Sequence, residues 1–134
     1  MKHVLALTYK PKIPDVRSGK CTQTIRPCGQ RPRRKDDLIM FHGWSDKPYR
    51  SKWNWRTPYW KIIEVLPIMI GSDFVEINPW LWDKLHVMDK EEMIDLAIRD
   101  GFKNFDEMYK QFELMYGSRL EDMIFEVIRW NYTP

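Results

Sequence analysis

The sequence predicts a single β-rich α+β domain, and three observations lead to this expectation. Short runs rich in β-branched and aromatic residues, bounded by glycine, proline and aspartate, are typical of strands. Two later segments carry apolar residues at helical spacing behind capping signals. A chain of 134 residues with 43% hydrophobic composition can bury one core without disulfides, so we expect one domain over residues 1–134.

The first elements are predicted to be a strand, a helical turn and a second strand. Val4–Tyr9 is a short mixed run typical of an opening strand, and Ile13–Ser18 is expected to form a helical turn that Gly19 ends. The β-branched residues of Thr22–Arg26 favour a strand. Because side chains alternate along a strand, Thr22, Thr24 and Arg26 would share one face. We expect this polar face to line a pocket.

The middle of the chain predicts two further strands that extend a barrel-like sheet. They cover Leu38–Trp44 and Lys61–Ile70, and Pro67 within the second one predicts an edge position or a bulge. Ser45–Trp60 between them is predicted to be a large loop or a frayed hairpin. This segment contains turn-forming residues at four positions, Asp46, Pro48, Asn54 and Pro58.

Two helices and a closing strand are expected in the last third of the chain. Asp89 and Glu92 have the spacing of a capping box at the start of the first helix. Asn104 and Glu107 repeat this signal at the start of the second, and a glycine follows each apolar stripe. Met123–Trp130 alternates well enough to be the last strand.

Charge is distributed unevenly along the chain. Residues 1–61 carry 15 Lys and Arg against 4 Asp and Glu, whereas residues 62–134 carry 7 against 15. The two parts therefore have net charges of +11 and −8, which together give the overall +3. A basic part of this kind attracts polyanions such as nucleic acid, and the acidic part opposes non-specific binding to them.

The cysteine, histidine and apolar content excludes several classes of protein. Cys21 and Cys28 are too few and too irregularly spaced for a disulfide framework or a zinc site, so we expect no metal and no cofactor. The longest apolar run, Val65–Ile70, is far shorter than the roughly 20 residues of a membrane-spanning helix. We therefore expect a cytoplasmic protein without a membrane partner.

A basic cluster follows the threonine-rich strand and is the first candidate binding site. Clustered cations beside a polar strand are suited to phosphate groups, although a run of charges is also typical of an ordinary solvated surface. Hydroxyl groups of the strand would contact a base edge or a ribose. The candidate nucleic-acid-binding residues of this region are Lys20, Thr22, Arg26, Arg31, Arg33, Arg34 and Lys35.

Aromatic and cationic residues alternate in a second candidate segment, from Lys52 to Lys61. This composition is used to stack the bases of single strands, so Trp53, Trp55 and Tyr59 are candidate stacking platforms. Burial at one end of a small barrel is the competing interpretation for Trp55 and Trp60. Three other tryptophans, Trp80, Trp82 and Trp130, are assigned to the core or to helix packing.

Three motifs in order give the chain a family resemblance. They are Gly19–Arg26 (GKCTQTIR), Lys35–Ile39 (KDDLI) and Asp100–Phe102 (DGF), the last of which precedes a helix. With Phe125–Trp130 as a final strand, the sequence resembles the ASCH domain, a branch of the PUA-like superfamily associated with RNA. The resemblance covers nearly the whole chain. It implies a small PUA-like β-barrel with two or three flanking helices that binds RNA or a nucleotide.

The ASCH family that this sequence resembles also includes enzymes. Some members act as small amidohydrolases on acylated cytidine, and others are described as nucleases. For the amidohydrolases the resemblance implies a lysine, a threonine and an acidic residue at the positions of Cys21, Thr24 and Asp100. The lysine is replaced here by cysteine, while Lys20 is adjacent. Cys21 itself is either a nucleophile activated by nearby cations or a small inert residue. The candidate catalytic residues are thus Thr24, Asp100, Lys20 and Cys21.

Two functional hypotheses follow from these residues. The first is an RNA- or nucleotide-binding module that receives unpaired nucleotides on its basic and aromatic face. The second is a hydrolase of N4-acylated cytidine or of RNA, with Thr24 and Asp100 in its site. RNA or a nucleoside is the expected partner in both, and the acidic helical half leaves a protein partner possible.

Overall fold

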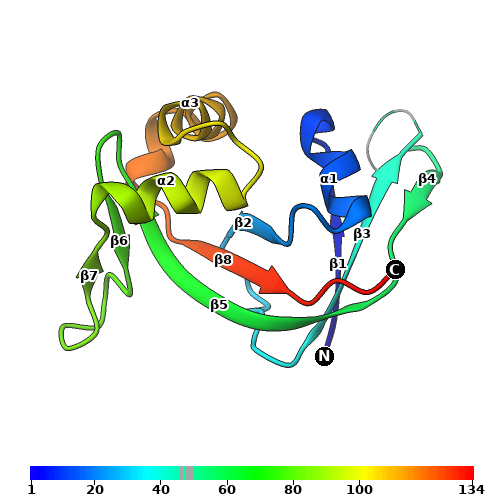
Figure 1. Ribbon diagram of the computed structural model, residues 1–134, viewed down its shortest axis with the longest axis horizontal. Helices are drawn as coiled ribbons and strands as arrows, with labels where there is room; N and C mark the ends of the chain where they lie inside the picture. Colours follow the sequence, from blue (N-terminus) through cyan, green and yellow to red (C-terminus); the bar gives the residue numbers. More distant parts are fainter. Residues whose placement is uncertain (46, 48–49) are drawn as a thin grey trace.

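The computed structural model describes residues 1–45, 47 and 50–134. Within them, eight strands form one connected mixed sheet, and helices lie along its concave side (Figure 1). The predicted α+β class and the flanking helices are therefore confirmed. The strands are β1 (Lys2–Ala6), β2 (Gln23–Pro27), β3 (Leu38–Trp44), β4 (Trp53–Arg56), β5 (Trp60–Ile70), β6 (Val75–Ile77), β7 (His86–Val87) and β8 (Phe125–Trp130). The helices are α1 (Ile13–Ser18), α2 (Lys90–Arg99) and α3 (Phe105–Tyr116), with two 3-10 turns, η1 (Lys10–Lys12) and η2 (Gly117–Asp122).

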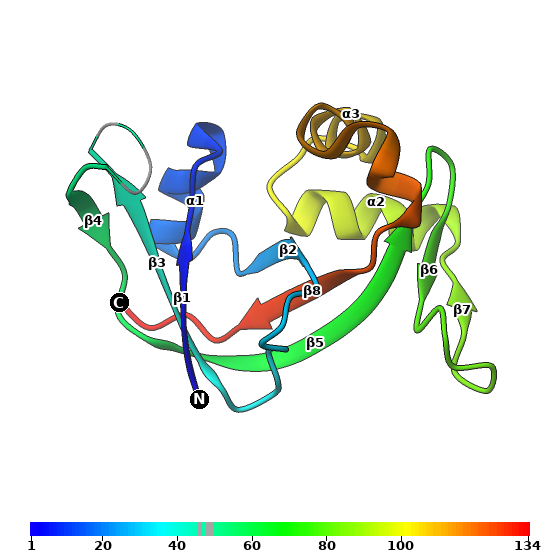
Figure 2. The ribbon, with the colours of Figure 1, turned by 180° about the vertical axis from the view of Figure 1, so that it is seen from behind.

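Strand β5 connects the two ends of the sheet. Its start pairs with β3, its middle with β8 and its end with β6, while β1 lies parallel to β3 and β2 lies beyond β8. Figure 2 shows the same strand from behind as one long arc beneath both groups of elements. In the described part of the chain no backbone pairing joins β1 to β2, so the sheet is not closed. The predicted barrel is thus unconfirmed.

The bulge predicted at Pro67 lies elsewhere in β5. The register of β5 against β8 shifts between Ile62 and Glu64, whereas Pro67 sits in register opposite Glu126. Pro67 has no amide hydrogen to donate, and its carbonyl accepts a hydrogen bond from Asn78 N at 2.9 Å. The ring is accommodated because β6 begins to pair with β5 only at Ile68.

Two apolar cores share strand β8. Phe125 and Val127 belong to the core beneath α2 and α3, whereas Ile128 and Trp130 belong to the core near β1 and β3. Alternate side chains of a strand point to opposite faces, so β8 is buried on both, and four of its six residues are apolar. Trp130 is 2% exposed, which confirms its assignment to the core.

Two of the three tryptophans assigned to the core lie instead on the surface. Trp80 is 54% exposed and Trp82 is 94% exposed. Both belong to the connection between β6 and β7, a pair of short strands that the sequence did not predict. The assignment was wrong because it took aromatic character alone as a sign of burial.

The predicted helix starts are confirmed at the level of hydrogen bonds. Asp89 and Glu92 exchange side-chain to backbone hydrogen bonds in a complete capping box before α2. Asn104 Oδ1 accepts from Glu107 N at 2.8 Å before α3. None of the helices in the described residues is long and apolar enough to cross a membrane.

The segment from Ser45 to Trp60 contains a hairpin strand. β4 pairs antiparallel with β3, and Gly43 lies opposite Trp55 in this ladder. A side chain at position 43 would collide with the Trp55 indole at its Nε1 atom, so only glycine permits this packing. The hairpin alternative is therefore confirmed, while Asp46 and Pro48 lie outside the described residues.

Candidate functional site

A cavity of about 140 Å³ lies between the β1–η1 segment, strand β2 and helices α2 and α3. It brings together three residues that the sequence indicated, Thr24, Arg26 and Asp100. It also contains a fourth chemically active side chain, Lys12, which sequence reasoning missed. We call this space the base cavity below.

Lys12 and Asp100 form a buried ion pair at the base cavity. Lys12 Nζ lies 3.1 Å from Asp100 Oδ2, and the two side chains are only 5% and 4% exposed. Gln23 Nε2 donates to the other carboxylate oxygen at 3.1 Å. Burial raises the pKa of Asp100, and the Lys12 cation and the Gln23 amide offset part of that rise. The carboxylate follows the last residue of α2, where the helix dipole is unfavourable, and Lys12 compensates for this placement.

Thr24 and Arg26 lie on the same face of β2, as the strand alternation predicted. Thr24 is 3% exposed, and its Oγ1 accepts a hydrogen bond from Arg26 Nε at 3.3 Å. The second arm of the guanidinium donates to the carbonyl oxygen of Ala6 at 2.7 Å. Arg26 therefore bridges the side where β1 and β2 are not paired, and the guanidinium forms one rim of the base cavity.

Four aromatic rings form part of the apolar wall of the base cavity. Tyr9 stacks on Phe102 with ring centroids 5.4 Å apart, and Phe112 meets Phe102 edge-on at 6.5 Å. Tyr116 completes this side, and its burial raises the pKa of its hydroxyl. A small apolar space with a few convergent polar groups is the usual form of a small-ligand site.

Cys21 and Lys20, the other two candidate catalytic residues, are not among the residues that line the base cavity. The Cys21 thiol is buried and donates to the carbonyl oxygens of Arg99 at 3.2 Å and Gln23 at 3.4 Å. Burial raises the pKa of this thiol, which disfavours the thiolate needed for nucleophilic attack. Lys20 is exposed. Thr22 is half-buried, and its backbone carbonyl accepts from Trp130 N.

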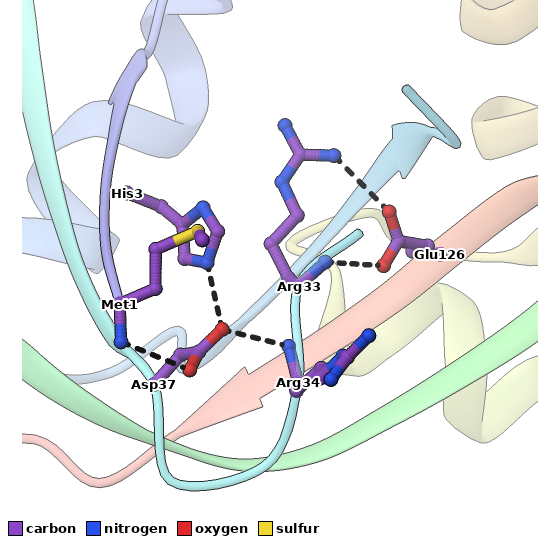
Figure 3. Close-up of polar contacts among 6 residues, drawn as sticks. All are labelled: Met1, His3, Arg33, Arg34, Asp37 and Glu126. Carbon is purple, nitrogen blue, oxygen red and sulfur yellow. Dashed lines mark hydrogen bonds and ion pairs between the residues drawn. The ribbon is translucent and has the colours of Figure 1, made fainter. Parts of the chain in front are cut away.

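Arg33 attaches the basic segment, residues 31–35, to the sheet next to the base cavity. Its guanidinium NH1 lies 3.2 Å from Oε1 of Glu126, and its backbone N–H donates to the other oxygen at 3.2 Å (Figure 3). The same guanidinium donates to the carbonyl oxygen of Pro27, which lines the base cavity. Arg33 therefore holds the segment in place, beside a buried carboxylate.

Asp37 anchors the other end of the basic segment. Its carboxylate accepts from Arg34 N at 3.1 Å and lies 2.8 Å from His3 Nε2, and the amino group of Met1 is also in contact (Figure 3). The hydrogen bond from His3 is the main reason that the pKa of Asp37 is lowered. With the backbone fixed in this way, the segment exposes three cations, Arg31, Arg34 and Lys35.

The aromatic segment, from Lys52 to Lys61, contributes no residue to the lining of the base cavity. Trp53 is 41% exposed and stacks on the His42 ring at 3.9 Å. Burial, together with the charge of Arg26, lowers the pKa of His42 and favours its neutral ring. Trp55 is half-buried beneath the Arg17 guanidinium, 5.3 Å from the ring centroid. Neither tryptophan lines the base cavity.

Sequence reasoning missed Lys12 because a lysine between two prolines in a short linker is normally solvated. The available signal was Asp100, whose carboxylate at a helix C-terminus needs a cation nearby. Comparison with family models, with curated proteins and with solved structures gave no match. Among the described residues, no group of three or more His, Cys, Asp and Glu side chains is placed to hold a metal ion.

Proposed function

We propose that the protein binds an unpaired nucleotide, with the base in the base cavity and the phosphate at the basic segment. The observation that carries the proposal is the convergence of the Thr24 hydroxyl, the Lys12–Asp100 pair and aromatic walls in one cavity that Arg26 borders. The resemblance to ASCH domains supports RNA as the natural source of that nucleotide and a cytoplasmic location. The open, curved sheet would then be the family's barrel in incomplete form.

The size of the base cavity favours a pyrimidine. A cavity of about 150 Å³ accommodates benzene in an engineered protein, and the present one measures about 140 Å³. One six-membered ring therefore matches this volume, and a larger ligand would extend out of the open side of the cavity. The ribose and phosphate would remain outside, beside Arg26 and the exposed cations Arg31, Arg34 and Lys35.

Removing the Thr24 hydroxyl should weaken pyrimidine binding selectively. Thr24→Val keeps the shape of the side chain but removes one hydrogen-bonding group, so we expect affinity for cytidine or uridine monophosphate to fall about fivefold. Isothermal titration calorimetry of both nucleotides would measure this. The matched control is Thr22→Val, at the position just before β2 and outside the cavity, which should bind like the wild type. Unchanged affinity in Thr24→Val, or no measurable binding by the wild type, would contradict the proposal.

A second candidate function is hydrolysis of an N-acylated pyrimidine, and the position of Lys12 favours it. The lysine absent from the third position of the GKCTQTIR motif is replaced by one from η1, which reaches the cavity that holds Thr24 and Asp100. The Thr24 oxygen would attack the amide carbon, the Lys12 ammonium would stabilise the developing oxyanion, and the Asp100 carboxylate would relay the hydroxyl proton to the departing amine. Water would then cleave the acyl-threonine ester.

This hydrolase hypothesis predicts that turnover of N4-acetylcytidine depends on Thr24. We expect Thr24→Val to lower the rate at least about 100-fold, because the proposed ester forms on the Thr24 hydroxyl. Chromatographic detection of released cytidine would measure it. Cys21→Ser serves as the control, since that side chain lies outside the cavity and serine still donates to the same carbonyl groups. Wild-type rates in Thr24→Val would exclude the mechanism, and nucleotide binding without turnover would favour the binding function alone.

A further inference from the structure

A second hollow adjoins the base cavity, and we call it the tryptophan groove. It has a volume of about 470 Å³ and is bounded by the segment from β1 to α1 on one side and by β3 and β4 on the other. Leu7 and Thr8 line both this groove and the base cavity. The two spaces are therefore separated by one short stretch of chain, and a single extended ligand can reach both.

Aromatic surface in the tryptophan groove comes from Trp44 and Trp55. The Trp55 indole is fixed in place because it packs over Gly43 on one side and beneath the Arg17 guanidinium on another. A rigid indole in a groove offers a stacking surface with little loss of side-chain entropy on binding. The groove is also larger than the base cavity, so its volume accommodates a purine as well as a pyrimidine.

The charge around the tryptophan groove favours an anionic occupant. Lys10 is exposed and lines the groove, and none of its described lining residues is acidic. Arg17, Lys52 and Arg56 are exposed on the neighbouring elements α1 and β4 or just before them. Flat aromatic surface combined with cations is how proteins grip single-stranded nucleic acid.

We propose that the tryptophan groove binds the nucleotide adjacent to the one in the base cavity, with its base stacked on Trp55 and its phosphate near Lys10. This inference rests on the proposed nucleotide-binding function of the base cavity. It extends the site from one nucleotide to at least two nucleotides of the same strand. It also gives Trp55 a function in addition to packing.

Comparison of a mononucleotide with a dinucleotide tests the proposal. We expect the cytidine dinucleotide pCpC to bind about tenfold more tightly than cytidine monophosphate, in the range that stacking of one base provides. Trp55→Leu keeps apolar packing but removes the ring, so it should lower dinucleotide affinity about fivefold or more and leave monophosphate affinity unchanged. Trp82→Ala is the matched control, since the β6–β7 connection lies at the opposite end of the molecule from β4 (Figure 1).

Lys10→Gln provides a second variant in case Trp55→Leu fails to fold, because Lys10 is exposed. It should reduce the dependence of dinucleotide affinity on salt concentration and leave that of the monophosphate unchanged. Equal affinities of the wild type for the two ligands would overturn the inference and leave the base cavity proposal standing. Conversely, dinucleotide binding that depends on Trp55 but not on Thr24 would support the groove and contradict the base cavity. A hexaglutamate peptide bound as tightly as pCpC in a Trp55-dependent manner would assign the groove to an acidic protein segment and overturn the inference.

Discussion

Replacing Lys12 with methionine is expected to lower the free energy of unfolding by about 3–5 kcal/mol, the usual cost of leaving one partner of a buried ion pair without its counter-charge. The Asp100 carboxylate is 4% exposed, and after the substitution it would keep the hydrogen bond from the Gln23 amide and the weaker influence of the Arg26 charge. Methionine fills a similar volume, so little of the loss should come from packing. Chemical denaturation of the wild type and the variant would measure the difference.

The loss of folding stability caused by Lys12→Met should increase as the pH rises. Burial already raises the pKa of Asp100, and loss of the cation raises it further. A carboxyl with a raised pKa in the folded state holds its proton more tightly there than in the unfolded chain, so the variant loses stability relative to the wild type as pH rises above about 4. The penalty should therefore be smaller at about pH 4 than at about pH 8.

A double variant provides the control for this prediction. In Lys12→Met/Asp100→Leu the buried charge is gone as well, and stability should return to within about 1–2 kcal/mol of the wild type. Gln23 keeps a partner there, because its Nε2 also donates to the carbonyl of Leu96 at 3.0 Å. A double variant that is less stable than Lys12→Met would show that the ion pair is not the source of the loss.

Replacing Arg33 with alanine is expected to destabilise the protein by about 3 kcal/mol, at the lower end of the range for a broken buried pair. Glu126 is 4% exposed and would lose its guanidinium partner, but it would keep the backbone N–H of residue 33. The hydrogen bond to Pro27 would also be lost, so the basic segment should loosen next to the base cavity. Thermal and chemical denaturation would both detect the change.

Arg31→Ala and Arg34→Ala are the matched controls for Arg33→Ala, because both side chains are exposed. Each should change stability by less than about 0.5 kcal/mol, as surface substitutions normally do. Equal effects of all three substitutions would contradict the structural assignment of Arg33. The contrast also guides binding studies. A variant that lacks Arg33 could lose RNA affinity through unfolding as well as through lost phosphate contacts. Replacement of Arg31 and Arg34 would test the phosphate contacts alone.

Local chemistry made much of the fold predictable from the sequence. Leu38–Trp44 has the predicted bounds of β3, and the caps at Asp89 and Asn104 form as expected, because capping depends on residues only three positions apart. Two elements were missed although their strand partners lie close in the sequence. β6 and β7 are short, and neither is long enough to show a periodic pattern.

The candidate site was predictable in part for the same reason. Thr24 and Arg26 share a strand face, which the alternation of side chains along a strand predicts. Asp100 was indicated by the motif that precedes the second long helix. Lys12 lies 88 positions before Asp100 in the chain, and nothing in its neighbours indicates burial. Only the packing of η1 against the end of α2 creates that contact.

The continuity of β5 has a consequence for how the molecule unfolds. Its backbone hydrogen bonds hold β3 at one end and β6 at the other, and the two apolar cores meet along its neighbour β8. Neither half can release this strand without exposing apolar surface in the other, so the domain should melt in a single cooperative transition. A substitution that destabilises the side of the tryptophan groove should therefore lower the stability of the helical side as well.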